Sequence, residues 1–298
     1  MNAKRWTRHV IWIAAALCAA CSPQRSAPPR PVPPGPGATF SIGVPSASSH
    51  GPSVAARPPY AAIAWTATTI DGQSSIYLAT SEDNGRTFSP PRRIADAQTA
   101  PGAVPAPRVL LGWVRFTSDD DRMPEIHVVW REEPSKTFRA VASTDDGRTF
   151  APEEADENGW PSALPVQAGL KTPPAPLVQR AVHDVKATHH AAAYDECGTL
   201  MVAWDDEAHA TPSHVTLRRL VRSADGSVVV LQTIPLSGTA SAVNPVVASL
   251  RGGVAVAWET GGADSQIAIR RVGFQSICQA PVPDNPPAGV QRRASAAN

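Results

Sequence analysis

Four short runs of apolar residues recur along the chain, and each of them ends in a tryptophan. They are Ile63-Ala64-Trp65, Val128-Val129-Trp130, Val202-Ala203-Trp204 and Val256-Ala257-Trp258. The runs are apolar at every position instead of alternating with polar residues, which is typical of strands that are covered on both faces. Successive tryptophans lie 65, 74 and 54 residues apart (130 − 65, 204 − 130 and 258 − 204). The pattern therefore predicts four repeated units, each built on one buried strand, with insertions in the connections.

Further strands are predicted around each tryptophan strand. A polar loop and a third strand follow each tryptophan, at residues 76–80, 138–142, 215–221 and 267–272. Upstream partners are visible at 109–116, 189–194 and 245–250, and an outer strand is plain only at 228–234. This order of strands is that of a propeller blade, and the body has no convincing amphipathic helix period. We therefore predict an all-β fold, a β-propeller of four recognisable four-stranded blades.

Two of the predicted blades are incomplete in the sequence. The first lacks an obvious inner strand and the fourth lacks an outer one. Residues 39–45 or the carboxy-terminal tail could supply the missing strand and close the propeller. Closure matters because an open propeller leaves strand edges unpaired.

Two near-identical octapeptides follow the third strands of the first two units. Both read Ser-x-Asp-x-Gly-Arg-Thr-Phe, and a shortened form, residues 223–227, follows the third strand of the third unit. The aspartate can accept hydrogen bonds from turn N–H groups, and the glycine supplies a positive φ. We expect the serine and threonine hydroxyls to tie the strand ends and the phenylalanine to turn inward. The residues with these structural roles are Ser81, Asp83, Gly85, Thr87 and Phe88, and Ser143, Asp145, Gly147, Thr149 and Phe150.

These octapeptides resemble the Asp-box (BNR) repeat of sialidase-like β-propellers. The resemblance implies a fold, whereas a reaction has to be argued from the site itself. Sialidases use an arginine triad, a tyrosine nucleophile paired with a glutamate, and an aspartate acid/base. They also carry an Arg-Ile-Pro-type motif, but Arg93-Ile94-Ala95 and Arg108-Val109-Leu110 both lack the proline.

Only three tyrosines could serve as a sialidase-type nucleophile. Tyr60 and Tyr77 fall within predicted blade strands, as core residues would. Tyr194 precedes Asp195 and Glu196, but it ends an inner strand on the Asp-box side, opposite the face that carries the active site in sialidases. We therefore assign no catalytic residue and expect no sialidase turnover.

A second polar cluster follows the third tryptophan strand. It comprises Asp205, Asp206, Glu207, His209 and His214, in a loop expected on the face opposite the Asp-boxes. Three carboxylates and two imidazoles could hold a divalent metal or a polar ligand. The histidine spacing matches no specific metal motif, and a solvated loop is the alternative. We expect no cofactor.

The amino-terminal leader predicts export. Lys4, Arg5 and Arg8 precede an apolar stretch, residues 10–20, that is too short to span a bilayer as a helix. Its end, Leu17-Cys18-Ala19-Ala20-Cys21, resembles the lipobox of bacterial lipoproteins, although Cys18 stands where that family usually has leucine. The resemblance implies cleavage before Cys21, a lipid on its sulfur and, since Ser22 follows, an outer membrane lipoprotein facing the periplasm or the cell surface. An ordinary secretory signal or an uncleaved anchor is the alternative.

Proline distribution divides the rest of the chain. We predict a lipoprotein signal peptide at residues 1–20, a proline-rich spacer at 21–51, the Asp-box propeller at 52–278 and a disordered tail at 279–298. Removing the three leader cations changes the net charge from +1 to +1 − 3 = −2. A nearly neutral body gives no electrostatic argument for nucleic-acid binding.

Cys197 and Cys278 are the only cysteines left once the leader is cut and Cys21 carries a lipid. The envelope is an oxidising compartment, so we predict a disulfide between them.

Taken together, the sequence favours a lipid-anchored, non-catalytic propeller that binds a protein or glycan partner. An exo-sialidase-type glycoside hydrolase and a cell-envelope assembly factor are the alternatives.

Overall fold

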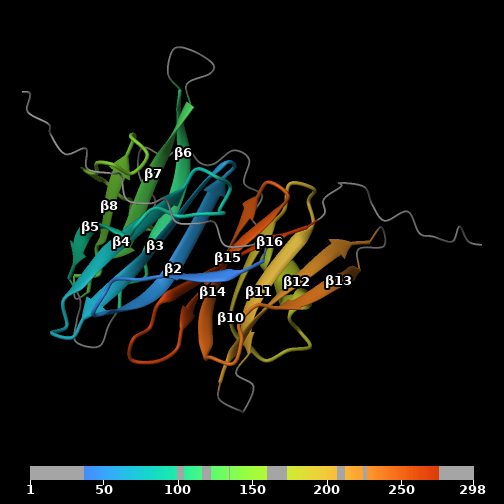
Figure 1. The fold of residues 1–298 in the computed structure, drawn as a ribbon. Coiled ribbons are helices and arrows are strands. Elements are labelled where there is room, and N and C mark those ends of the chain that lie inside the picture. The colour runs from blue at the N-terminus through green and yellow to red at the C-terminus, as the bar shows by residue number, and fades with distance from the viewer. Residues whose placement is uncertain are drawn as a thin grey trace, which may run out of the picture. The chain divides into compact units, whose positions relative to one another are not determined.

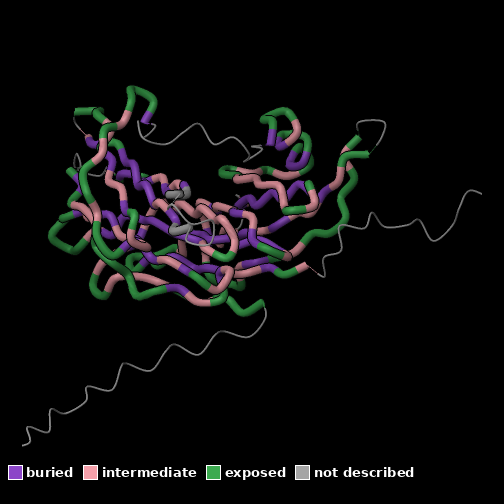
Figure 2. Tube along the Cα trace, turned by 90° about the horizontal axis from the view of Figure 1, so that it is seen from above, coloured by how far each residue is buried: buried purple, intermediate pink, exposed green. Residues whose placement is uncertain are grey.

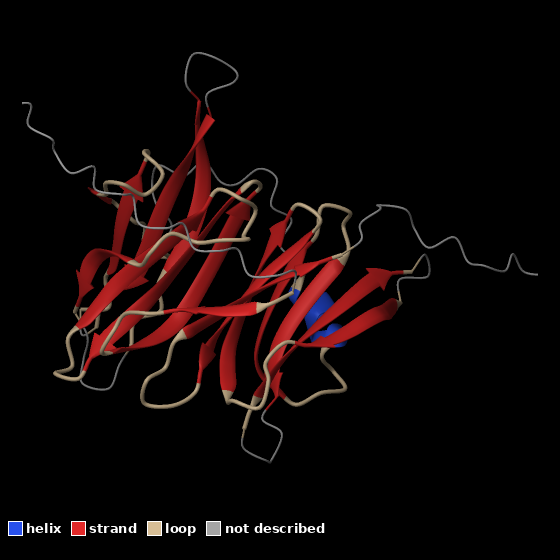
Figure 3. Cartoon of the chain, viewed as in Figure 1, coloured by secondary structure: helices blue, strands red, loops and turns tan. Residues whose placement is uncertain are grey.

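The computed structural model describes residues 37–98, 104–115, 122–133, 135–159, 173–206, 212–223 and 227–274. This part of the chain is almost entirely β-strand, with one short helix (Figure 3). The predicted leader, the lipidation site Cys21, the spacer up to residue 36 and the predicted tail all lie outside it. Among the residues that the structure describes, no helix has the length and apolar character needed to cross a bilayer.

The strands form four antiparallel sheets of four, which confirms the predicted all-β propeller with four blades (Figure 1). The first blade contains β2 (Ala47–Arg57), β3 (Tyr60–Thr69), β4 (Ser74–Ser81) and β5 (Arg92–Ala97). The second contains β6 (Arg108–Arg115), β7 (Arg122–Arg131), β8 (Phe138–Ser143) and β9 (Ala151–Glu153). The third contains β10 (Ala187–Tyr194), β11 (Leu200–Asp206), β12 (His214–Arg222) and β13 (Val228–Pro235). The fourth contains β14 (Ala242–Leu250), β15 (Gly253–Thr260), β16 (Ile267–Gly273) and, from the other end of the chain, β1 (Thr39–Ile42).

The strand β1 completes the fourth blade. It pairs antiparallel with β16, from Thr39 opposite Arg270 to Ile42 opposite Ile267. Of the two segments that could have supplied the missing outer strand, the amino-terminal one therefore does so. The pairing covers the edge of β16, which would otherwise offer unpaired backbone groups.

The predicted boundary between spacer and propeller at residue 52 has to be corrected, because it falls inside β2. This inner strand begins at Ala47, so residues 47–51, which the sequence assigns to the spacer, belong to the propeller, as do the residues of β1. Between His50 and Ser53 its register with β3 shifts, and Gly51 adopts a φ of +59°. An irregularity of this kind accommodates glycine and proline within a paired strand.

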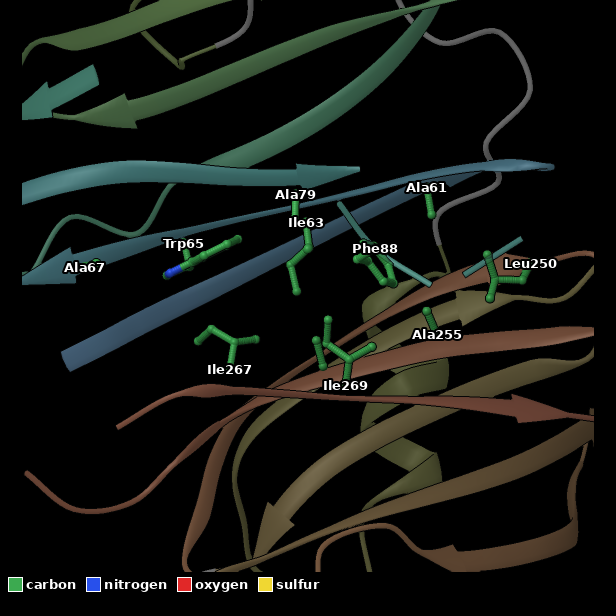
Figure 4. Packing of buried hydrophobic residues seen from close by; sticks show 11 residues of the cluster. Ala61, Ile63, Trp65, Ala67, Ala79, Phe88, Leu250, Ala255, Ile267 and Ile269 are labelled. Atoms are coloured by element: carbon green, nitrogen blue, oxygen red, sulfur yellow. The ribbon is translucent and has the colours of Figure 1, made fainter. Parts of the chain in front are cut away.

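Buried residues run along the central strands, whereas exposed residues lie in the loops and on outer strands such as β13 (Figure 2). Three apolar clusters each fill the space between two neighbouring blades, which we call a seam. The first seam joins the first and fourth blades, where Ile63 and Trp65 lie over Ile267 and Ile269 (Figure 4). The others join the first blade to the second and the third blade to the fourth. Each fully buried aliphatic side chain stabilises the fold by roughly 1.5–3 kcal/mol relative to exposure.

The tryptophans follow a common rule, with one exception. Trp65, Trp130 and Trp258 each pack into the seam with the preceding blade. Trp204 of the third blade instead packs against α1 (Ala175–Ala181), through Val178, Ala181 and Val182. Within the described residues no apolar cluster joins the second and third blades directly. The helix therefore takes the place that the second blade would occupy beside the third.

The sequence predicts no helix, and the length of α1 explains why. Its seven residues, with a proline in the first turn, are too few to show an amphipathic period. Its packing is supported by Arg218, whose guanidinium lies 4.9 Å from the centre of the Trp204 ring. The same guanidinium donates to the carbonyl oxygen of Ala181 over 2.8 Å and pairs with Asp184.

Each Asp-box closes a turn with hydrogen bonds to its aspartate. The Thr87 hydroxyl donates to Asp83 Oδ2 over 2.6 Å and the Thr87 N–H donates to Asp83 Oδ1 over 2.9 Å. Asp145 receives the equivalent bonds from Thr149 over 2.7 and 2.8 Å. Ser81 and Ser143 each donate to the aspartate and accept from the N–H of the box glycine.

A side chain in place of either box glycine would be unfavourable for two reasons, the backbone conformation and the lack of space. Gly85 and Gly147 have φ values of +74° and +77°. A Cβ on Gly85 would lie 2.9 Å from Leu250 of the fourth blade, and one on Gly147 would lie 3.3 Å from Leu78 of the first. Each Asp-box therefore also docks onto the preceding blade. Phe88 turns into the seam between the first and fourth blades, and Phe150 packs against the cluster between the first and second.

The same hydrogen bonds lower the pKa values of both box aspartates. Burial would raise the pKa of Asp83, but donors on Thr87, Ser81 and Arg86 together hold it below its usual 3.8. At Asp145, the Thr149 N–H and hydroxyl lower the pKa to about 2. Both side chains therefore stay ionised under ordinary conditions.

We predict that Asp83→Ala destabilises the protein by about 1–3 kcal/mol at neutral pH, because turn N–H groups lose their acceptor. The folded-state pKa lies below 3.8, so this stabilisation is complete above that pH and is lost as the pH falls through the lowered pKa. Urea unfolding at neutral pH and along an acid series measures both effects. The exposed neighbour Glu82→Ala is the control. A difference between Asp83→Ala and wild type that persists unchanged into acid would contradict the prediction.

Candidate functional site

The inner strands of all four blades line one cavity. The strands β2, β6, β10 and β14 are each the end strand of their sheet. The cavity has a volume of about 1050 Å³, and α1, the turn between β10 and β11, the end of β12 and the start of β13 also contribute to its wall. Most of its wall is aliphatic and small, as at Ala55, Val109, Ala192, Ala193 and Ala248. The volume lies near the upper end of the range for ligand pockets.

Charged residues gather where the cavity meets the Asp-box side. Tyr194, Asp195 and Glu196 end β10 and enter the turn, Arg222 ends β12, and Arg180 lies in the last turn of α1. The inner strand and the third strand of a blade end on the same side as its Asp-box, so Tyr194, Asp195, Glu196 and Arg222 share that side, as the sequence predicts for Tyr194. The group contains an arginine pair, a tyrosine and two carboxylates, which invites comparison with a sialidase site.

The two carboxylates of this group already have structural partners. Asp195 Oδ1 accepts the N–H groups of Cys197 and Thr199, over 2.9 and 2.8 Å, and so closes the β10–β11 turn. Glu196 Oε1 accepts the Gly252 N–H over 3.0 Å and ties this turn to the β14–β15 turn of the fourth blade. Tyr194 packs against the apolar cluster around α1. Each carboxylate therefore holds a turn through one of its two oxygens.

A second polar group lies at the opposite ends of the inner strands. Asp205 directly follows Trp204 and its side chain is 1% exposed. Its carboxylate accepts the His189 N–H over 2.7 Å, His189 Nδ1 over 2.8 Å and the Asn244 N–H over 2.9 Å. With three donors around it, Asp205 links the third blade to the fourth and offers no free oxygen to a ligand.

The chain of hydrogen bonds continues from the fourth blade to the first. The Asn244 amide donates to Glu259 Oε2 over 3.2 Å. Glu259 also pairs with His50 Nδ1 over 2.7 Å and accepts the Gly51 N–H over 3.2 Å. Asn244 has a φ of +55°, a left-handed conformation that asparagine tolerates better than most residues. Two histidine–carboxylate pairs thus lie at one end of the inner strands, with each carboxylate bonded to backbone N–H groups of the blades.

The residue after each tryptophan explains this arrangement. Thr66, Asp205 and Glu259 each bond to the start of the inner strand of the next blade; Thr66 does so through the carbonyl oxygen of Pro105. The fourth such residue, Arg131, bonds within its own blade, to the Lys136 carbonyl oxygen over 3.3 Å. The exception falls at the boundary that α1 occupies. Glu259 could have been identified from the sequence, because, like Asp205, it is the acidic residue that directly follows an apolar run ending in tryptophan.

The predicted ligand loop is only partly within the described residues. Asp206 Oδ1 accepts the His214 N–H over 3.2 Å, as two residues paired across β11 and β12. Glu207 and His209 lie outside the part of the chain that the structure describes. Across the described ranges, no group of three or more histidine, cysteine, aspartate or glutamate side chains is arranged to hold a metal ion.

Of the two cysteines in the predicted disulfide, only Cys197 is among the described residues. Cys197 lies in the turn between β10 and β11, on the Asp-box side. Cys278 lies outside the described residues, so its pairing with Cys197 stays a prediction.

We predict that Asp205→Ala destabilises the protein by about 1–3 kcal/mol for each of the two amide groups, on His189 and Asn244, that lose their acceptor. Asp206→Ala is the matched control, because that carboxylate accepts one long bond and is more exposed. Chemical denaturation compares the two variants. Equal stabilities would show that the bonds to Asp205 contribute nothing to the joint between the blades.

Comparisons with known proteins give distant structural similarity. No protein-family model matches the chain, and no curated protein matches its sequence. A Hadza microbial sialidase is 14% identical, with 76% of this chain and 53% of that chain covered and a TM-score of 0.30. A GH43 protein from Bacillus licheniformis is 10% identical, with 78% and 54% covered and a TM-score of 0.36. An α-L-arabinofuranosidase from Podospora anserina is 8% identical, with 79% and 93% covered and a TM-score of 0.33.

The chain spans about half the length of the first two of these structures. Similarity at this level carries no argument about activity, and the propeller assignment rests on the strand pairing described above. The chain is thus an all-β propeller with distant structural likeness to sialidases and other glycosidases.

Proposed function

We propose that this protein is a lipid-anchored, extracytoplasmic propeller that acts as a non-catalytic binding or scaffold module. Its partner is a protein or a glycan, bound in the cavity lined by the four inner strands. The observation that carries the proposal is the cavity itself, to which every blade and α1 contribute wall residues. A concave site shared by several elements and lined mainly by apolar side chains is the usual form of a binding site.

The chemistry of the wall favours binding over hydrolysis. Glycoside hydrolysis requires an acid and a base or nucleophile that are free to exchange protons. In the described wall, Asp195 and Glu196 instead accept backbone N–H groups that hold turns together. The small aliphatic side chains give shape to the cavity and leave the recognition of polar groups to backbone atoms and to the residues at its mouth.

The proposed location rests on the leader sequence. The segment ending in Cys21 resembles a lipobox, and a proline-rich stretch follows it. Such a stretch acts as a semi-rigid spacer that would keep the propeller away from the membrane. A binding module held in this way can reach partners in the envelope without crossing the bilayer itself.

Filling the cavity should abolish binding without unfolding the protein. We predict that Ala193→Trp removes the binding of ligands identified on peptide and glycan arrays, whereas Ala151→Trp retains it. Ala193 lines the cavity, and Ala151 is exposed on the outer strand β9. Both variants should release no product from a fluorogenic sialoside, as wild type should not. Array ligands that bind a correctly folded Ala193→Trp protein as tightly as wild type would place the site elsewhere, and hydrolysis lost in Tyr194→Phe would make the protein an enzyme.

Replacing Cys21 with serine should leave the protein unlipidated. We predict that the variant appears in the soluble periplasmic fraction of a Gram-negative host, while wild type fractionates with membranes and incorporates labelled palmitate. Cys18→Ser is the control, because the lipobox reading assigns no lipid to that residue. Membrane association that survives Cys21→Ser would refute the lipid anchor.

A further inference from the structure

Two arginines that line the cavity have no acidic partner for their guanidinium groups among the described residues. Arg180 and Arg222 both line it and both are exposed. In the described part of the chain no carboxylate pairs with either guanidinium. The nearby carboxylates are already engaged: Asp184 with Arg218, Asp195 with turn N–H groups and Glu196 with Gly252. These two guanidinium groups can therefore donate hydrogen bonds to a ligand, and a carboxylate is the acceptor that matches their geometry and charge.

The wall of the cavity consists of strand edges. Each of β2, β6, β10 and β14 pairs on one side only within its sheet. The backbone N–H and C=O groups along its other edge have no partner strand in that sheet, and such an edge is a template for an additional strand. Beside these edges stand small side chains, including Ala55, Ala56, Ala192, Ala193 and Ser249. Small residues let another backbone approach within hydrogen-bonding distance.

These features select one class of ligand. An extended polypeptide presents alternating N–H and C=O groups that complement a free strand edge, which a glycan or an acyl chain does not. Recognition of sugars commonly depends on aromatic faces, and Tyr194 is the one aromatic residue in the described wall. A carboxylate at the end of the peptide would complement the arginines at the mouth.

We propose that the cavity binds the carboxy-terminal segment of a partner polypeptide in extended conformation. The segment adds as a strand along the free edge of an inner strand, and its terminal carboxylate is held by Arg180 and Arg222. This inference rests on the proposed function, because it names the partner of that same cavity. It goes further in fixing the conformation of the ligand, the end of the chain that is read and the two residues that read it.

The first test is an array of random hexapeptides, each printed both with a free carboxy terminus and as the carboxy-terminal amide. We expect binders in the free-acid set that are lost or strongly weakened as amides. A third form, amidated but ending in aspartate, separates a terminal carboxylate from a side-chain carboxylate. Binders that are equally strong as acid and amide, or no binder in the free-acid set, would overturn the proposal.

The second test examines the arginines with the strongest free-acid binder. Arg180→Gln and Arg222→Gln should each weaken its affinity by about tenfold in fluorescence anisotropy, the size of one charge-assisted interaction. Arg148→Gln is the matched control, since Arg148 is exposed on the second Asp-box and does not line the cavity. The amide form should respond to none of the three changes. Equal effects of Arg148→Gln and Arg222→Gln would refute the assignment of the carboxylate site.

A third measurement tests the added strand. Single N-methyl groups placed along the same peptide should reduce binding at alternate positions, because successive N–H groups of a strand point to opposite sides. Insensitivity to N-methylation would exclude strand addition. If glycans bind and only Ala193→Trp abolishes that binding, the proposed function stands and this inference fails; if Ala193→Trp leaves all binding intact, both fail.

Discussion

The structure depends on burying each tryptophan strand on both faces. Alternate residues of β3 show how this works: Ile63 and Trp65 pack toward the fourth blade, while Ala62 and Ala64 pack toward the second. A strand in this position has little solvent-exposed surface, so its buried side chains are mostly apolar. His127 of β7 is a buried exception, and it is paired with Glu153 over 2.7 Å. Each tryptophan strand therefore has to be covered on both of its faces, by a neighbouring blade or by another element. Where the third blade lacks the second as a direct neighbour, α1 covers Trp204 in its place.

The ends of the blades are joined by polar contacts that the apolar middle cannot provide. On one side, the residue after the tryptophan bonds to the next inner strand, as Asp205 and Glu259 do. On the other side, Asn84 of the first Asp-box exchanges two hydrogen bonds with the backbone of Arg251 in the fourth blade, over 2.8 and 2.9 Å. Buried carboxylates and amides are tolerated here because each meets donors or acceptors of a neighbouring blade. The two sets of contacts fix how neighbouring blades are aligned, which apolar packing alone leaves free to slide.

The cavity is a consequence of the same construction. Blades that pack through their faces leave the inner edges of β2, β6, β10 and β14 directed at a common space. The residues that bound this space have two different tasks. Asp195 and Glu196 hold turns, whereas Arg180 and Arg222 have no acidic partner among the described residues.

The sequence by itself determined the features that depend on neighbouring residues. The tryptophan strands could be predicted because continuous apolar runs are enough to identify strands with two covered faces. The Asp-boxes could be predicted because Ser81, Asp83 and Thr87 bond to one another within a single turn.

Only the tertiary structure decided the rest, since those features join residues far apart in the chain. The sequence left residues 39–45 and the carboxy-terminal tail as candidates for the closing strand, and the pairing of β1 with β16 decided between them. The polar segment at residues 47–53 becomes a strand because β3 offers it an edge. Asp205, which in the sequence resembles a ligand residue of an exposed loop, is instead buried against Asn244 of the next blade. Hydrogen-bond partners of this kind are set by how the blades pack, so the chemistry of a buried carboxylate cannot be deduced from its sequence neighbours alone.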